Sequence, residues 1–133
     1  MSTIPKPTFD ELMRLAQASN AVTRACACEL ASYHEWARIP PTFPEAQMRI
    51  VGTLVDDPYL EASYVEYHPA GTSYWSPEAP IAPRHFPYNR CNVLQCEVCG
   101  RAALKYVEAG GYYVEPRLRL LDPQLLVDAP APD

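Results

Sequence analysis

Residues 90–113 read RCNVLQCEVCGRAALKYVEAGGYY and contain three of the five cysteines of the chain and its only Gly-Gly pair. Cys96 and Cys99 are separated by two residues and are followed by Gly100. Two intervening residues let a turn wrap both thiolates around one ion, and a glycine relieves the tight bend that follows. Cys91 lies on the segment that should lead into this turn as a strand, so it would supply a third thiolate. We therefore predict a knuckle that holds a structural Zn2+ ion.

A closed tetrahedral site requires four ligands, whereas this segment offers three cysteines. We predict that the fourth ligand is His85, six residues before Cys91, which would fold the intervening proline-rich loop back onto the knuckle. Three other side chains are reserves for the same role, in the order His68, Cys28 and Cys26.

Other interpretations of the knuckle have to be weighed. The cysteines could be free thiols, Cys91 could pack in the core, or a water could occupy an open metal position and support chemistry. The acid and base groups near the knuckle in sequence are His85, Glu97 and Glu108. A thioredoxin-like redox site would open a helix, whereas residues 102–107 look extended. We expect a closed, structural site and no enzymatic activity.

The residues after the knuckle predict a β-hairpin and a short C-terminal region. Residues 104–108 and 112–115 flank Ala109-Gly110-Gly111, whose glycines would take positive φ angles in the turn. Residues 117–121 predict an edge strand. Asp122 followed by Pro123 predicts the start of one helical turn that continues through Leu126. Residues 128–133 are predicted to be a disordered tail.

Upstream, residues 8–38 have the periodicity of an amphipathic helix, or of two helices with a break at Ser19-Asn20. Residues 1–7 predict a flexible arm, and Thr8 with Glu11 predicts a capping box at the helix start. On a helix, two residues correspond to about 200° of rotation, so the thiols of Cys26 and Cys28 would point to opposite sides. Cys26 would then lie in the core, and Cys28 would face outward or lie under another element. If this segment is not helical, both thiols could face one way and compete as ligands.

Residues 44–68 predict two strands joined by a turn at Asp56-Asp57-Pro58. Glu66 and His68 would share one face of the second strand and could form an acid/base pair, but no nucleophile motif accompanies them and we expect them to be solvated. Residues 69–90 contain five prolines and therefore predict a long surface loop. Its aromatic residues Tyr74 and Trp75 would either anchor a partner or cover a thin core.

Composition fits one α+β domain over residues 1–133, with the helical segment packed on a small antiparallel sheet and the knuckle hairpin near the C-terminus. The chain has 48% hydrophobic residues and a net charge of −5. It lacks a run of about 18 apolar residues and a signal-peptide layout, and its odd number of cysteines fits a disulfide framework poorly. We therefore expect a cytoplasmic protein.

The Cys96–Gly100 knuckle, followed by a strand and a hairpin, resembles the knuckle of a zinc ribbon. The pattern CGRxxLxYxExGGYY from Cys99 is similar to small uncharacterised bacterial proteins. The resemblance covers residues 91–113. Zinc ribbons usually carry two CxxC knuckles, whereas here Cys91 and His85 stand in for the first. The resemblance implies a structural ion and either nucleic-acid or protein partners.

These observations predict a non-catalytic, zinc-stabilised module, such as an inhibitor, an immunity-type protein or an adaptor, that binds a protein partner through Tyr74 and Trp75. The acidic charge would favour a basic partner. A nucleic-acid accessory protein is the alternative, in which Tyr88 or Tyr106 would stack on unpaired bases. Its basic contacts would come from Arg84, Arg90, Arg101, Lys105, Arg117 and Arg119. A metal-dependent enzyme is the third interpretation.

Overall fold

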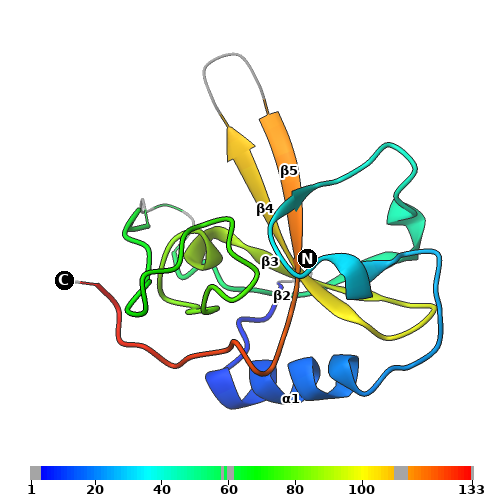
Figure 1. Ribbon diagram of the computed structural model, residues 1–133, viewed down its shortest axis with the longest axis horizontal. Helices are drawn as coiled ribbons and strands as arrows, with labels where there is room; N and C mark the ends of the chain where they lie inside the picture. Colours follow the sequence, from blue (N-terminus) through cyan, green and yellow to red (C-terminus); the bar gives the residue numbers. More distant parts are fainter. Residues whose placement is uncertain (1–3, 58, 60–61, 110–113, 133) are drawn as a thin grey trace.

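A computed structural model describes residues 4–57, 59, 62–109 and 114–132 (Figure 1). It contains one α-helix and a five-stranded antiparallel sheet with the strand order β1-β5-β4-β3-β2. The predicted α+β class is therefore confirmed. The elements are α1 (Phe9–Asn20), β1 (Ala37–Arg38), β2 (Met48–Thr53), β3 (Asn92–Cys96), β4 (Ala102–Ala109) and β5 (Val114–Leu120), with short 3-10 turns at Leu30–Ser32, Glu45–Gln47 and Tyr88–Arg90.

Helix α1 begins at the predicted capping box. The Thr8 hydroxyl accepts a hydrogen bond from the Glu11 N–H at 3.1 Å, and the Glu11 carboxylate accepts one from the Thr8 N–H at 2.9 Å. The helix ends at Asn20, so the prediction of helix through residue 38 is wrong beyond that point. At this end the Ser19 hydroxyl accepts a 2.8 Å hydrogen bond from the Ala102 N–H, which joins the helix to the start of β4.

The helical periodicity beyond Asn20 has a different cause. The apolar side chains that follow, including Cys28 and Leu30, pack in a second core cluster with Leu94 and Leu118 of the sheet. They are therefore buried in turns and a 3-10 segment that fold against the sheet. A spacing of three to four residues is ambiguous between these two situations when only the sequence is considered.

Strand β2 confirms the first strand predicted in residues 44–68, but the described residues 62–68 do not form the second. Strand β2 pairs with β3, far along the chain, with a register shift between Ile50 and Gly52. At Gly52 a Cβ atom would lie 3.3 Å from the carbonyl oxygen of Pro5. The N-terminal arm therefore packs against β2, and Thr53 N–H donates to Pro5 O at 3.0 Å. For residues 4–7 the prediction of a flexible arm is wrong.

Strands β4 and β5 form the predicted hairpin, with register from Ala103↔Leu120 to Ala109↔Val114. The hairpin extends away from the end of the molecule where α1 lies (Figure 1). Its predicted glycine turn lies outside the described residues. The predicted edge strand at residues 117–121 belongs to β5, which lies between β4 and β1, so it is not at an edge.

The proline-rich segment 69–90 is a loop, as predicted, and a buried arginine attaches it to the sheet. Arg119 of β5 is fully buried and donates hydrogen bonds to Pro77 O at 3.1 Å and Ala79 O at 2.9 Å. It also donates to His34 O and to the Tyr88 hydroxyl. Each of the three guanidinium nitrogens thus donates a hydrogen bond to an oxygen atom, which offsets the cost of burying the charge.

The C-terminal residues also pack on this loop. Leu125 N–H donates to Asp122 O at 3.2 Å, which closes the single turn predicted there. Ala129 is buried, and its carbonyl accepts a hydrogen bond from Arg84 at 3.2 Å. The prediction of a disordered tail is therefore wrong for residues 128–132.

Candidate metal centre

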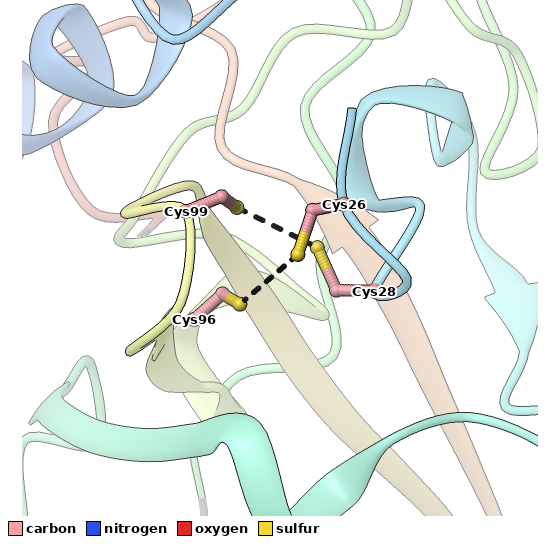
Figure 2. Close-up of side chains that lie close together, drawn as sticks. All are labelled: Cys26, Cys28, Cys96 and Cys99. Atoms are coloured by element: carbon pink, nitrogen blue, oxygen red, sulfur yellow. Dashed lines mark hydrogen bonds between the residues drawn. The ribbon is translucent and has the colours of Figure 1, made fainter. Parts of the chain in front are cut away.

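Four cysteine sulfurs converge at one side of the sheet, with two from each of two distant segments (Figure 2). Cys26 and Cys28 lie between α1 and the Leu30–Ser32 turn, Cys96 ends β3, and Cys99 lies in the turn before β4. All four sulfurs lie within 4.8 Å of one another. Between the two segments, the Cys26 and Cys96 sulfurs lie 3.8 Å apart and the Cys28 and Cys99 sulfurs lie 3.6 Å apart.

These distances fit a tetrahedral ion. Metal–sulfur bonds of about 2.3 Å at tetrahedral angles place the sulfurs about 3.8 Å apart. Each cysteine offers one sulfur, so the protein alone can fill four coordination positions. The cluster is therefore positioned to bind one metal ion in a closed site.

The knuckle forms as its sequence predicts. Cys96 N–H donates to Arg101 O at 2.8 Å, and Gly100 N–H donates to Cys96 O at 2.8 Å, which closes the turn. Gly100 has a φ of 90°, a conformation that side chains with a Cβ rarely adopt. Arg101 N–H points at the Cys99 sulfur at 3.4 Å, as backbone amides do in thiolate metal sites.

The second pair of sulfurs depends on the early end of α1. Residues 26–28 form a turn, in which Glu29 N–H donates to Cys26 O at 3.1 Å and Glu29 adopts a left-handed φ of 53°. In this turn both sulfurs face the knuckle. The assumed helix is wrong here, and so is the placement of Cys26 as the buried residue of the pair: Cys26 is partly exposed, and Cys28 is buried.

Two polar side chains surround the sulfurs. The Gln47 side-chain oxygen lies 3.6 Å from the Cys26 sulfur and 3.5 Å from that of Cys96, so both thiols donate to it. Thiolates on a metal only accept, and rotation of this amide would present its N–H groups to them. The buried Arg101 guanidinium donates to Val22 O at 3.2 Å, which ties the two cysteine segments together.

The four thiols share their protons unequally. Burial opposes ionisation of Cys99, but the Arg101 backbone N–H and the neighbouring thiols donate to its sulfur and lower its pKa to about 7. Burial raises the pKa of Cys28 and of Cys96 above their usual value. Of Cys28, Cys96 and Cys99, Cys99 therefore ionises most readily in the metal-free cluster, because hydrogen bonds from its neighbours stabilise its thiolate.

The structure does not bring Cys91 and His85 to this cluster, so the predicted ligand set is corrected from Cys91 and His85 to Cys26 and Cys28. Cys91 points to the other side of β3, into the main core, where its thiol donates to Pro87 O at 3.3 Å and burial raises its pKa well above the usual value. His85 Nε2 donates to Pro130 O at 2.8 Å. Of the reserve ligands, the two that ranked last are the ones that join the site.

His68, the first reserve, is held elsewhere by two side chains. Its Nε2 lies 2.7 Å from a Glu66 oxygen, and its Nδ1 lies 2.7 Å from the Thr72 hydroxyl. Glu66 and His68 are thus in contact, which was the less favoured of the two interpretations, and the contact forms in a loop and not on a strand.

The two predicted partner-binding aromatics differ in exposure. Tyr74 is partly buried, and its ring stacks on Trp36 with centroids 6.1 Å apart. Trp75 is 53% exposed, and the Arg117 guanidinium lies 4.8 Å from its ring centroid. Tyr74 therefore covers the core, whereas Trp75 presents an aromatic surface to solvent.

Comparison with known proteins found no matching family model, no matching curated protein and no matching solved structure. Among the described residues, no helix is both long and apolar enough to cross a membrane. The fold and site together define a class: an α+β protein with a four-cysteine candidate metal centre that joins its N-terminal third to the central strands of its sheet.

Proposed function

We propose that this protein is a non-catalytic protein-binding module stabilised by a structural zinc ion. The observation that supports a zinc ion is the set of four sulfurs that lie within 4.8 Å of one another. Four thiolate ligands in a tetrahedral arrangement suit zinc, whose structural sites are closed in this way. Catalytic zinc keeps an open position for water or substrate, and a fully thiolate-filled site leaves none.

The position of the cluster supports a role in stability. Cys26 and Cys96 are 70 residues apart in the chain, and Cys28 and Cys99 are 71 apart. An ion at this point would close a long loop and fasten the turn-rich segment after α1, which otherwise depends on the small second core cluster. Closing long loops removes much of the conformational freedom of the unfolded chain.

The protein-binding part of the proposal is supported by the surface around Trp75. Its indole is half exposed, and its neighbour Tyr74 is fixed against Trp36 and accepts a 3.1 Å hydrogen bond at its hydroxyl from the Arg117 guanidinium. A large aromatic side chain held on a rigid base loses little entropy on binding, and tryptophan is enriched at binding hot spots. The net charge of −5 suits a partner of opposite charge.

The nucleic-acid alternative gains no such support. Two of its six basic side chains, Arg101 and Arg119, are buried and bonded to backbone carbonyls. Arg117 forms a 2.6 Å ion pair with Glu115. A groove that binds phosphates needs exposed, clustered cations.

The zinc ion is tested by elemental analysis of protein purified without added metal. We expect about one zinc per chain, and Cys96→Ser should lower this content severalfold and reduce the melting temperature. Cys91→Ala is the matched control: it removes a buried thiol outside the cluster, so it should retain the zinc despite a cost of about 1 kcal/mol in stability. If the purified protein contains no metal and all five thiols can be titrated, the proposal that the cluster binds zinc is refuted.

The partner surface is tested by affinity capture from the native host. Tagged wild-type protein and Tyr59→Ala, in which a 95% exposed tyrosine is removed, should capture the same partner. Trp75→Ala should reduce capture at least tenfold, because truncation of a central aromatic typically costs about 2 kcal/mol in binding. Equal capture by Trp75→Ala would place the interface elsewhere.

A further inference from the structure

The cysteine cluster combines unequal exposure with close approach between segments. Of the four cysteines, Cys28 and Cys96 are fully buried, Cys99 is 9% exposed and Cys26 is partly exposed. Each N-terminal cysteine has a sulfur contact on the knuckle: Cys96 at 3.8 Å for Cys26 and Cys99 at 3.6 Å for Cys28 (Figure 2). A solvent-borne oxidant can therefore reach the Cys26 sulfur, and the Cys96 sulfur that would resolve it lies 3.8 Å away.

We propose that the cluster is a site of oxidation by hydroperoxides, in which Cys26 forms a disulfide with Cys96, Cys28 forms one with Cys99, and the metal ion is released. This inference rests on the metal ion of the proposed function. It adds a reactive role to the same four residues, whose geometry favours pairing across the two segments.

The chemistry balances with hydrogen peroxide as the oxidant. The Cys26 thiolate attacks one peroxide oxygen, the O–O bond breaks, and a sulfenic acid and a hydroxide form. The Cys96 thiolate attacks the Cys26 sulfur, the S–S bond forms, and a second hydroxide leaves. Cys28 and Cys99 repeat these steps with a second peroxide. In total, four thiolates lose four electrons, two peroxides and four protons become four waters, and one divalent ion leaves.

The pairing across segments has a structural consequence. A disulfide needs its sulfurs about 2.05 Å apart, so each pair must close by less than 2 Å. The two disulfides would connect the same segments that the metal connects, which keeps residues 26–28 attached to the knuckle. Pairing within the knuckle, between Cys96 and Cys99, would instead release the N-terminal segment. Oxidation would therefore replace the metal ion by two disulfides that connect the same segments, so the fold should stay intact.

The test uses metal-loaded protein treated with hydrogen peroxide, with released metal followed by a chromogenic chelator. Trypsin should cut after Arg24, Arg38, Arg90 and Arg101, giving peptides 25–38 and 91–101. We expect metal release. In the mass spectrum of the digest these two peptides should be joined, and they should separate when a dithiol is added. After denaturation, one thiol per chain should remain alkylatable, that of Cys91, which is fully buried outside the cluster.

The specific pairing is tested with two double variants that each leave one thiol per segment. Cys28→Ser with Cys99→Ser leaves Cys26 and Cys96, whereas Cys28→Ser with Cys96→Ser leaves Cys26 and Cys99. The first variant should form its intersegment disulfide severalfold faster, because it retains the Cys26 and Cys96 sulfurs, which are in contact at 3.8 Å. Equal rates would overturn the assigned pairing.

Other outcomes are also decisive. A Cys96–Cys99 disulfide, sulfinic acids in place of disulfides, or metal that stays bound in excess peroxide would overturn the inference while leaving the metal site valid. Metal content is measured before peroxide is added. Its absence at that stage would refute the proposed function, and the joined peptides would then decide the disulfide pairing separately.

Discussion

At the scale of single residues, Cys99 is the cysteine of the cluster whose pKa is lowered. Its sulfur receives hydrogen bonds from the Arg101 backbone and from neighbouring thiols, and these outweigh its burial. Its pKa falls from 9.0 to about 7. Because the folded pKa is lower than the unfolded one, the stability that this thiolate contributes to the metal-free protein is complete above about pH 9 and is lost as the pH falls through 7.

This pKa predicts a pH dependence of proton release on metal binding. At pH 8 the Cys99 thiol of the metal-free protein is already mostly ionised, whereas at pH 6 its proton must be displaced by the metal. Calorimetric titration in buffers of different ionisation enthalpy should therefore show about 0.8 more protons released per metal at pH 6 than at pH 8 from this residue. Equal release at the two pH values would contradict an ionised Cys99.

The ligands differ in how far the sequence alone could identify them. Cys96, Cys99 and Gly100 form a local motif, and local motifs determine their own turn geometry. On the predicted helix, the thiols of Cys26 and Cys28 point to opposite sides, which argued against them as ligands. The signal that favours them is the single residue between them, because this spacing brings both sulfurs to one side when the chain is not helical. His85 is close to Cys91 in sequence, but its ring is directed at Pro130 O by contacts that only the folded chain provides.

At the scale of elements, boundaries set by local hydrogen bonds were predictable, and pairings between distant segments were not. The capping box places the start of α1 correctly, because it involves side chains three residues apart. At the end of α1, the Ser19 hydroxyl accepts a hydrogen bond from Ala102, 83 residues away. Strand β2 was predicted from its β-branched residues, yet its partner is β3 and not the adjacent segment 62–68.

The capping box gives a prediction about helix stability. Thr8→Ala removes the acceptor for the Glu11 N–H and should lower the free energy of unfolding by about 1 kcal/mol. Thr23→Ala is the control, because Thr23 is exposed and lies outside α1, and its effect should stay within about 0.5 kcal/mol. Urea denaturation of both variants measures the difference, and equal destabilisation would argue against the cap as its source.

At the scale of the whole molecule, the α+β class followed from composition and pattern, but the compactness of the chain ends did not. The described residues near both ends pack on the body: Pro5 on β2 and Ala129 on the proline-rich loop. Proline-rich and alanine-rich ends have the composition of disordered segments, and only their contacts distinguish the two states. The buried Arg119 is a further example, since a charged residue in a strand is normally assigned to the surface.

The antiparallel pairing of β1 with β5 also constrains the order in which the chain can fold during its synthesis. Ala37 and Arg38 pair with Leu118 and Arg117. A nascent chain that has emerged only through residue 90 has its first two sulfur ligands but neither the knuckle nor the strands β3, β4 and β5. Its N-terminal third must wait, with its thiols exposed, until the hairpin has left the ribosome. Long-range pairings of this kind slow folding, so we expect the earlier residues to assemble on the C-terminal hairpin once it has formed.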